Sequence, residues 1–190
     1  MLLPSSRIRP EPDAVIDPRH YSVKDTLKNG TAVTIRAARP DDRERLISAF
    51  EKLDPETVYR RFLKYKEALT DADLERATKA DFDRRVVLLV TIGTGADEIV
   101  IGGASYTAFN APDGVRSAEV AFIVEEDYQG QGVASRLLRH LVEIARSKGI
   151  VRFEAEVLAD NRGMIAVFAR SGLPLQEQRE DGVVIVNMQL

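Results

Sequence analysis

Residues 119–149 constrain the fold most, because they form in succession a strand, a glycine-bearing loop and a helix. The first part is a short apolar run rich in β-branched residues, which predicts a strand through Val124. The last part repeats leucine, isoleucine and alanine at helical spacing and ends at Gly149, typical of a helix C′ position. Between them lie Gly130 and Gly132. A helix N-terminus after such a loop offers free backbone N–H groups, so the loop is predicted to cradle a phosphate.

The spacing of this loop narrows the kind of phosphate site. A Walker loop needs Lys and then Ser or Thr after its second glycine, and a Rossmann fingerprint needs three glycines with an acidic residue about 20 positions later. Neither pattern is present. The loop resembles the acetyl-CoA pyrophosphate loop of the GNAT superfamily, Gln/Arg-x-x-Gly-x-Gly/Ala, through Gln129, Gly132 and Ala134. The alternative is a tight turn between a strand and a helix, without a ligand.

Composition limits the possible chemistry. The chain has 190 residues, enough for one domain, and its net charge of −3 argues against a nucleic-acid partner. It has no Cys, which excludes disulfides and a Cys nucleophile, and no metal is expected. Of its two histidines, His20 lies in a Pro-rich leader and His140 is expected on the solvated side of the helix. With no long apolar run, we expect a cytoplasmic protein without a membrane partner.

The remaining segments are predicted to build a sheet around the strand–loop–helix unit. Residues 1–20 contain four prolines among charges and are expected to form an extended or disordered arm. Asn29–Gly30 favours a type I′ turn inside a hairpin. The strand after the long helix should be parallel to the Glu119 strand, because it follows a helical crossover. Helix starts are expected at Asp41 or Asp42, Asp54, Thr70 and Asn161. Further strands are expected over 86–92, 99–109 and 151–157, and a closing hairpin over 175–179 and 183–190.

Order and spacing over residues 31–190 resemble the GNAT fold. The resemblance implies an α/β (α+β) domain over residues 21–190, with a mostly antiparallel sheet, one splayed parallel strand pair and helices on both faces. It is most similar to the catalytic domain of Pat-type protein lysine acetyltransferases, which act on metabolic enzymes, acyl-CoA synthetases foremost. Such enzymes often carry an acyl-CoA-synthetase-like or cyclic-nucleotide-binding domain, for which the residues before the hairpin are too few. The segments that carry this resemblance are Arg39–Asp42, Leu53–Phe62, Ala118–Phe122 and Glu156–Met164.

The resemblance implies that Glu119 is the general base. A lysine amine has a pKa near 10.4, so presenting it neutral at pH 7 costs roughly 4–5 kcal/mol. Partial burial beside Val120 and Phe122 is expected to bring the Glu119 carboxyl into the working range of a base, acting directly or through a water. Glu156 is the reserve candidate. The alternative for Glu119 is an exposed strand carboxylate in a salt bridge.

The same resemblance implies acetyl-CoA as co-substrate and protein lysines as partners. The pantetheine arm is expected to enter between the parallel strands. Asn161 matches a family asparagine and would serve equally well as a helix N-cap. Phe168 stands where many GNAT enzymes have a Tyr acid, and a thiol of pKa about 8.5 leaves tolerably without it. The expected cofactor contacts are Ile123, Val124, Gln129, Gly130, Gln131, Gly132, Val133, Ala134, Ser135, Asn161 and Phe168.

Three functions remain open from the sequence. They are a protein lysine acetyltransferase, an acetyltransferase for small amines or amino acids, and a non-catalytic CoA-sensing module. In either enzyme, the lack of Cys favours direct attack by the amine in a ternary complex, with a backbone N–H polarising the thioester. Tyr59, Arg60 and Arg61 would contact an acidic substrate surface or form a solvated helix face. The sequence leaves the acceptor, the oligomeric state and the regulation undefined.

Overall fold

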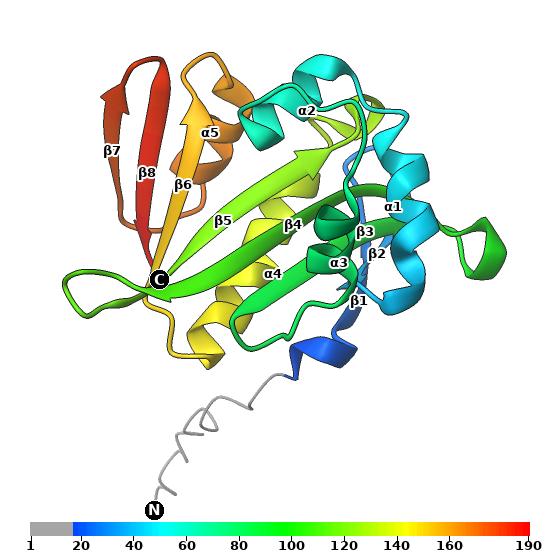
Figure 1. Cartoon of the computed structure of the whole chain (residues 1–190), viewed down its shortest axis with the longest axis horizontal. Helices are drawn as coiled ribbons and strands as arrows, with labels where there is room; N and C mark the ends of the chain where they lie inside the picture. Colours follow the sequence, from blue (N-terminus) through cyan, green and yellow to red (C-terminus); the bar gives the residue numbers. More distant parts are fainter. Residues whose placement is uncertain (1–16) are drawn as a thin grey trace, which may run out of the picture.

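The computed structural model describes residues 17–190, which form one eight-stranded sheet in the order β1-β2-β3-β4-β5-β6-β8-β7 (Figure 1). All neighbouring strands are antiparallel except β5 and β6, which are parallel. The sheet is therefore the mixed one that was predicted. The strands are β1 (Ser22–Thr26), β2 (Ala32–Ala37), β3 (Arg85–Ile92), β4 (Ile99–Asn110), β5 (Arg116–Val124), β6 (Arg152–Leu158), β7 (Leu175–Glu180) and β8 (Val183–Gln189).

Helices cover both faces of the sheet (Figure 1). On one face lie α1 (Arg43–Phe50), α2 (Pro55–Phe62) and α3 (Asp71–Thr78); on the other lie α4 (Val133–Ser147) and α5 (Arg162–Ala169). The strand β3 is buried on both faces, as its unbroken apolar run predicted. Its alternate residues therefore belong to two cores, with Val86 and Leu88 toward α4 and Val87 and Leu89 toward α1 and α3. Within residues 17–190, no helix is long and apolar enough to cross a bilayer.

Local signals set most helix ends. The Thr70 hydroxyl accepts from the Asp73 backbone N–H at 3.2 Å, and the Asp73 carboxylate accepts from the Thr70 N–H at 2.8 Å, which confirms the predicted capping box of α3. Pro55 occupies the first turn of α2. At the other end of α4, Gly149 has φ +71° and the next N–H donates to Ala145 O at 3.0 Å, as a C′ glycine should.

The first hairpin differs from the prediction. Gly30 has φ +88°, but Asn29 is not in the positive-φ region, so the expected type I′ turn is wrong. Strand pairing stops at Thr26–Ala32, and the loop closes by bonds from Leu27 N to Thr31 O (2.9 Å) and from Gly30 N to Leu27 O (3.0 Å). In this longer loop, the Lys28 backbone N–H donates to the Gln131 carbonyl in the predicted phosphate loop. The Asn29–Gly30 pattern predicts only local turn geometry, so it could not indicate this long-range contact.

The expected N-terminal arm falls mainly on residues 1–16, which lie outside the described residues. Residues Pro18–His20 form a short 3₁₀ turn, η1, in which Pro18 is buried. The Arg19 guanidinium donates to Asp81 O at 3.3 Å and fastens the turn beside the start of β3.

The expectation for His140 is wrong, because this side chain is 5% exposed instead of solvated. The Tyr21 hydroxyl and His140 Nδ1 form a hydrogen bond between the start of β1 and α4. Burial raises the pKa of Tyr21 to about 12, so the phenol keeps its proton and can donate it. The spacing of apolar residues along α4 led to the wrong prediction for His140, because it takes no account of the N-terminal segment that covers this side of the helix.

This burial predicts a pH-dependent stability. Burial first, and then the neighbouring Arg139 charge, lower the pKa of His140, whereas Glu143 and Asp25 oppose the shift. The unfolded state therefore binds more protons below about pH 6.5, so the free energy of unfolding should fall there as pH decreases, by up to about 1.4 kcal/mol per pH unit. Urea unfolding at pH 7.5 and 5.5 checks this. The variant His140→Phe should show a flatter dependence, and an equal slope in both proteins would contradict the assignment.

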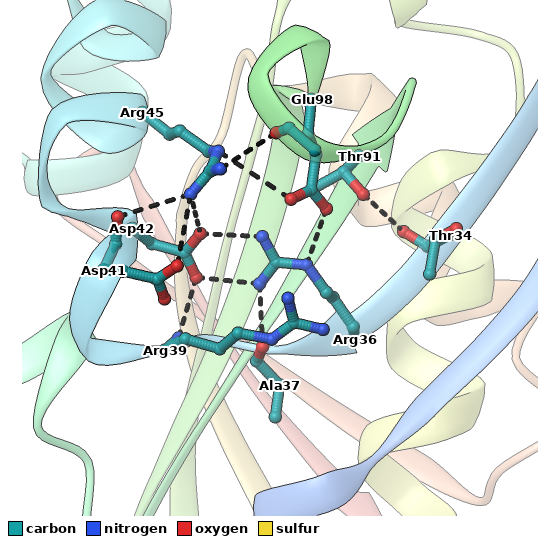
Figure 2. Close-up of polar contacts among 10 residues, drawn as sticks. Thr34, Arg36, Ala37, Arg39, Asp41, Asp42, Arg45, Thr91 and Glu98 are labelled. Atoms are coloured by element: carbon teal, nitrogen blue, oxygen red, sulfur yellow. Dashed lines mark hydrogen bonds and ion pairs between the residues drawn. The ribbon is translucent and has the colours of Figure 1, made fainter.

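A second buried polar cluster joins three segments of the chain (Figure 2). The guanidinium of Arg36 donates two bonds of 2.7 Å to the carboxylate of Asp42, and its Nε donates to Glu98 at 2.8 Å. The side chains of Arg36 and Asp42 are 1% and 0% exposed. Asp41 or Asp42 was expected to cap the next helix. Asp42 occupies the N-cap position of α1, but its carboxylate makes no capping bond, because it accepts from Arg36 and from the Arg39 N–H (2.7 Å). The cluster anchors the start of α1 to β2 and to the β3–β4 connection.

Candidate active site

The parallel strands β5 and β6 separate in mid-sheet. They pair only through Ser117–Arg152, Ala118–Phe153 and Glu119–Glu154, although both strands continue for several residues. Beyond Glu119, the edge of β5 that faces β6 therefore has no strand partner. This is the predicted divergence of the parallel pair.

A cavity of about 410 Å³, here called the strand-gap cavity, lies at this separation. It is bounded by β5, β6, α5 and the loop before α4. It brings together almost all of the residues predicted to contact a cofactor. Those that line it are Ile123, Val124, Gln129, Gly130, Gly132, Val133, Ala134, Ser135, Asn161 and Phe168.

The loop before α4 presents a row of free backbone donors to this cavity. Within residues 17–190, the N–H groups of Gly130, Gly132, Val133, Ala134 and Ser135 have no protein acceptor. Gly132 adopts φ +86° as the N-cap of α4, so the last three groups belong to the first turn of the helix and lie at its positive end. This donor set fits the pyrophosphate of a CoA thioester.

The loop is held from behind by β1. Arg136 Nε donates to Asp25 at 2.9 Å, and its Nη1 donates to the carbonyls of Gln131 (3.4 Å) and Gly132 (3.3 Å). The Gln131 carbonyl also accepts from Lys28 N at 3.3 Å. Gln131 thus supports the loop and does not line the strand-gap cavity, unlike the other predicted loop residues. Lys28 does line it, and no local pattern marks this residue, because it comes from a hairpin about 100 residues earlier.

Replacing Gly132 with Ala should weaken acetyl-CoA binding about tenfold. An L-residue at φ +86° costs about 1–2 kcal/mol, and the added Cβ would collide with Nη1 of Arg136, which supports the loop. Titration calorimetry measures the change. Gly149→Ala is the matched control, because φ is +71° there but the Cβ meets nothing within 4 Å and the site is at the far end of α4. Unchanged affinity in Gly132→Ala would argue against the cradle.

Two further predicted residues complete the walls. The Asn161 side chain accepts from Met164 N at 3.1 Å and caps α5, so it is an N-cap and a lining residue at once. Phe168 is 1% exposed and meets Phe122 edge-on with ring centroids 5.8 Å apart. It thus forms an apolar wall of the cavity.

Gln129 connects the loop to the helices on the opposite face of the sheet. Its Nε2 donates to Thr57 Oγ1 of α2 at 3.3 Å and to Val124 O at 3.1 Å. Arg60 and Arg61 of the same helix also line the strand-gap cavity. Both arginines are half-buried, so they do not form a fully solvated helix face, and their contact with an acidic substrate surface stays a prediction.

A second cavity, of about 700 Å³, lies between the sheet and α1, α2 and α3, and is here called the helix-side cavity. Glu119 lines this cavity and is exposed. The expected burial of Glu119 beside Val120 and Phe122 is therefore wrong. Adjacent side chains of a strand point to opposite faces, so these two neighbours lie toward α4 and α5 while Glu119 lies toward α2.

The helix-side cavity is lined by three other carboxylates, those of Asp73, Glu125 and Glu156. Glu156 also lines the strand-gap cavity, so the reserve candidate lies where the two cavities meet. Glu125 was missed by the sequence analysis; burial first, and then the charges of Asp127 and Glu126, raise the pKa of Glu125. It follows Glu119 by six residues, about 20 Å of extended chain, so the two carboxylates do not form a pair.

Comparison with known proteins agrees with this geometry. A model described as the acetyltransferase (GNAT) family matches residues 46–173. Acetyltransferase Pat from Mycolicibacterium smegmatis is 34% identical over 146 residues, which are 77% of this chain and 42% of Pat. The chain thus spans less than half the length of that relative.

Solved structures show the same fold. The GNAT domain of S. lividans PAT superposes with a TM-score of 0.80 at 38% identity, covering 89% of this chain and 97% of that domain. The structure of yncA from Salmonella typhimurium with its cofactor acetyl-CoA has a TM-score of 0.64 at 20% identity, covering 83% and 92%, and shows the fold alone. The family model matches more than half of the chain, and the strand gap and the N–H cradle of this structure agree with that match. The protein therefore belongs to the GNAT family of acetyltransferases.

Proposed function

We propose that this acetyltransferase transfers the acetyl group of acetyl-CoA to lysine Nε-amines of proteins, acyl-CoA synthetases being the first acceptors to test. The observation that carries the proposal is the meeting of two cavities at the strand gap. Arg61, Val120, Ala121, Ile123 and Glu156 line both. A thioester held by the cradle would thus face an amine that enters from the helix side. The likeness to Pat supports a protein acceptor.

The residues at this junction suit direct transfer. The cradle N–H groups would bind the pyrophosphate, and the edge of β5 that lacks a β6 partner, near Ile123 and Val124, would align the pantetheine arm. Glu119, directly or through a water, would accept the proton that the ammonium must lose before the nitrogen attacks the carbonyl carbon. A C–N bond forms, the C–S bond breaks, and CoA leaves as the thiolate, which takes up the second proton that the attacking nitrogen loses as it becomes the amide. The chain has no Cys to carry an acetyl-enzyme.

The test is acetyl-CoA consumption by the purified protein with candidate acyl-CoA synthetases, followed by mass-spectrometric mapping of the modified lysines. We expect a small number of specific sites whose modification depends on Glu119. Acetylation of small amines but of no protein would favour the second enzyme reading. If the protein binds acetyl-CoA but acetylates neither proteins nor small amines, the third hypothesis, a non-catalytic CoA-sensing module, would be favoured.

A further inference from the structure

Three side chains form a row across the floor of the helix-side cavity. Arg85 on β3, Thr107 on β4 and Glu119 on β5 are successive register partners, so they lie on the same face of the sheet. Arg85 Nη1 donates to Thr107 Oγ1 at 2.7 Å, and its Nε donates to Arg76 O at 3.1 Å. These two bonds fix the guanidinium beside the proposed base and leave its Nη2 available.

A second guanidinium reaches the same place from α2. Arg61 is half-buried, and it lines both cavities. Burial first, and then the nearby charge of Arg85, lower the pKa of Arg61, whereas the Glu119 charge raises it. Two cations and the proposed base thus occupy one region of the helix-side cavity.

On the α3 side of this cavity, three charges are paired with one another. The Asp73 carboxylate is held by Lys66 and by Arg76 Nη2, the latter at 2.5 Å. By contrast, within residues 17–190 no carboxylate oxygen lies within 4.0 Å of the guanidinium nitrogens of Arg61 or Arg85. A partly dehydrated cation without a counter-ion is unfavourable, and an anionic ligand group would relieve that cost.

We propose that Arg61 and Arg85 form a carboxylate-binding subsite of the acceptor cavity, so that the preferred acceptors carry a carboxylate close to the amine that is acetylated. This inference rests on the proposed acetyl transfer and names the chemistry of its acceptor. The charge pattern fits one substrate with two groups: Glu119 faces the ammonium, and the two guanidiniums face the carboxylate. A planar carboxylate also matches the fork of donors that a guanidinium offers.

The carboxylate can come from two sources, which separate assays distinguish. One assay compares a peptide with Asp beside its lysine and the same peptide with Asn. The other compares a free amino acid with its amide. The proteins are the wild type, Arg61→Gln, Arg85→Gln and Arg84→Gln. The last is a matched control, because Arg84 is exposed, lines neither cavity and undergoes the same change in charge.

For wild type and Arg84→Gln, we expect at least about tenfold higher kcat/KM for the carboxylate member of one pair, mainly through a lower KM. In Arg61→Gln and Arg85→Gln, this preference should fall to about threefold or less. In Arg85→Gln, whose side chain lines only the helix-side cavity, the KM for acetyl-CoA and the rate on the neutral member should not change. Equal rates on both members in the wild type, or a full preference in both arginine variants, would overturn the subsite while acetyl transfer itself stands. No transfer to any acceptor would instead contradict the proposed function.

Discussion

Replacement of Glu119 by Gln is expected to lower the rate constant of acetyl transfer about 10²- to 10⁴-fold at pH 7, with acetyl-CoA affinity unchanged. The amide keeps the size of the side chain but cannot accept a proton from the acceptor ammonium. Glu119 lines the helix-side cavity and is not among the residues of the strand-gap cavity, so the donors that hold the pyrophosphate are unaffected. Single-turnover kinetics and titration calorimetry measure the two quantities separately.

The pH dependence gives this prediction a second readout. As pH rises toward the amine pKa near 10.4, solution supplies the neutral nucleophile without a base, so the deficit of Glu119→Gln should shrink. Glu156→Gln is the comparison variant, because Glu156 lines the same cavity. A larger loss in Glu156→Gln would transfer the role of base to that residue. A pH-independent deficit would indicate that Glu119 only positions the acceptor.

Removing the carboxylate of Asp42 is expected to cost about 3–5 kcal/mol of unfolding free energy, a large part of the 5–15 kcal/mol typical of a domain. In Asp42→Ala, the Arg36 guanidinium loses both 2.7 Å bonds and remains buried with only Glu98 as its carboxylate partner (Figure 2). Denaturant unfolding measures the loss. The double variant Arg36→Met, Asp42→Leu should lose less, because no buried charge is left unpaired.

The same pair predicts acid sensitivity of a defined sign. Burial alone would raise the pKa of Asp42, but the hydrogen bonds from Arg36 and the Arg39 N–H, and the Arg36 charge, hold it below its ordinary value. Its contribution is therefore complete above about pH 4 and is lost as pH falls through the folded-state pKa. The double variant Arg36→Met, Asp42→Leu should not show this loss of stability at low pH, because it has no carboxylate at position 42. A single variant as stable as the wild type would show that Glu98 alone compensates the guanidinium.

Local patterns predicted the strand–loop–helix unit that borders the strand-gap cavity, and the reason is physical. A strand, a glycine loop and a helix that follow one another in sequence also meet in space, so Gly132 and the first turn of α4 could be placed from spacing alone. The expected GNAT sheet, with its single parallel pair, was confirmed. The parallel pairing of β5 and β6 could be predicted because a helix connects the two strands. The cap at Asn161 also depends on bonds three residues apart.

The acceptor side depends on contacts between distant segments. Arg85, Thr107 and Glu119 meet through strand register, which follows from three separate strands and not from any one of them. The burial of His140 depends in the same way on Tyr21, which is 119 residues away. The exposure of Glu119 was mispredicted for a different reason: its apolar neighbours were taken as its surroundings, although strand alternation turns them to the opposite face.

The early end of the β5–β6 pairing also affects how this protein avoids association with other chains. An unpaired strand edge is ordinarily a template for aggregation, and sheets usually protect theirs with charges, bulges or a covering segment. Here two such edges face each other across a gap that is walled by α5 and the loop before α4. A neighbouring polypeptide would have to bring a whole strand into that gap, whereas a slender extended ligand arm needs far less width. The unpaired edge is therefore kept available for a ligand and denied to other chains.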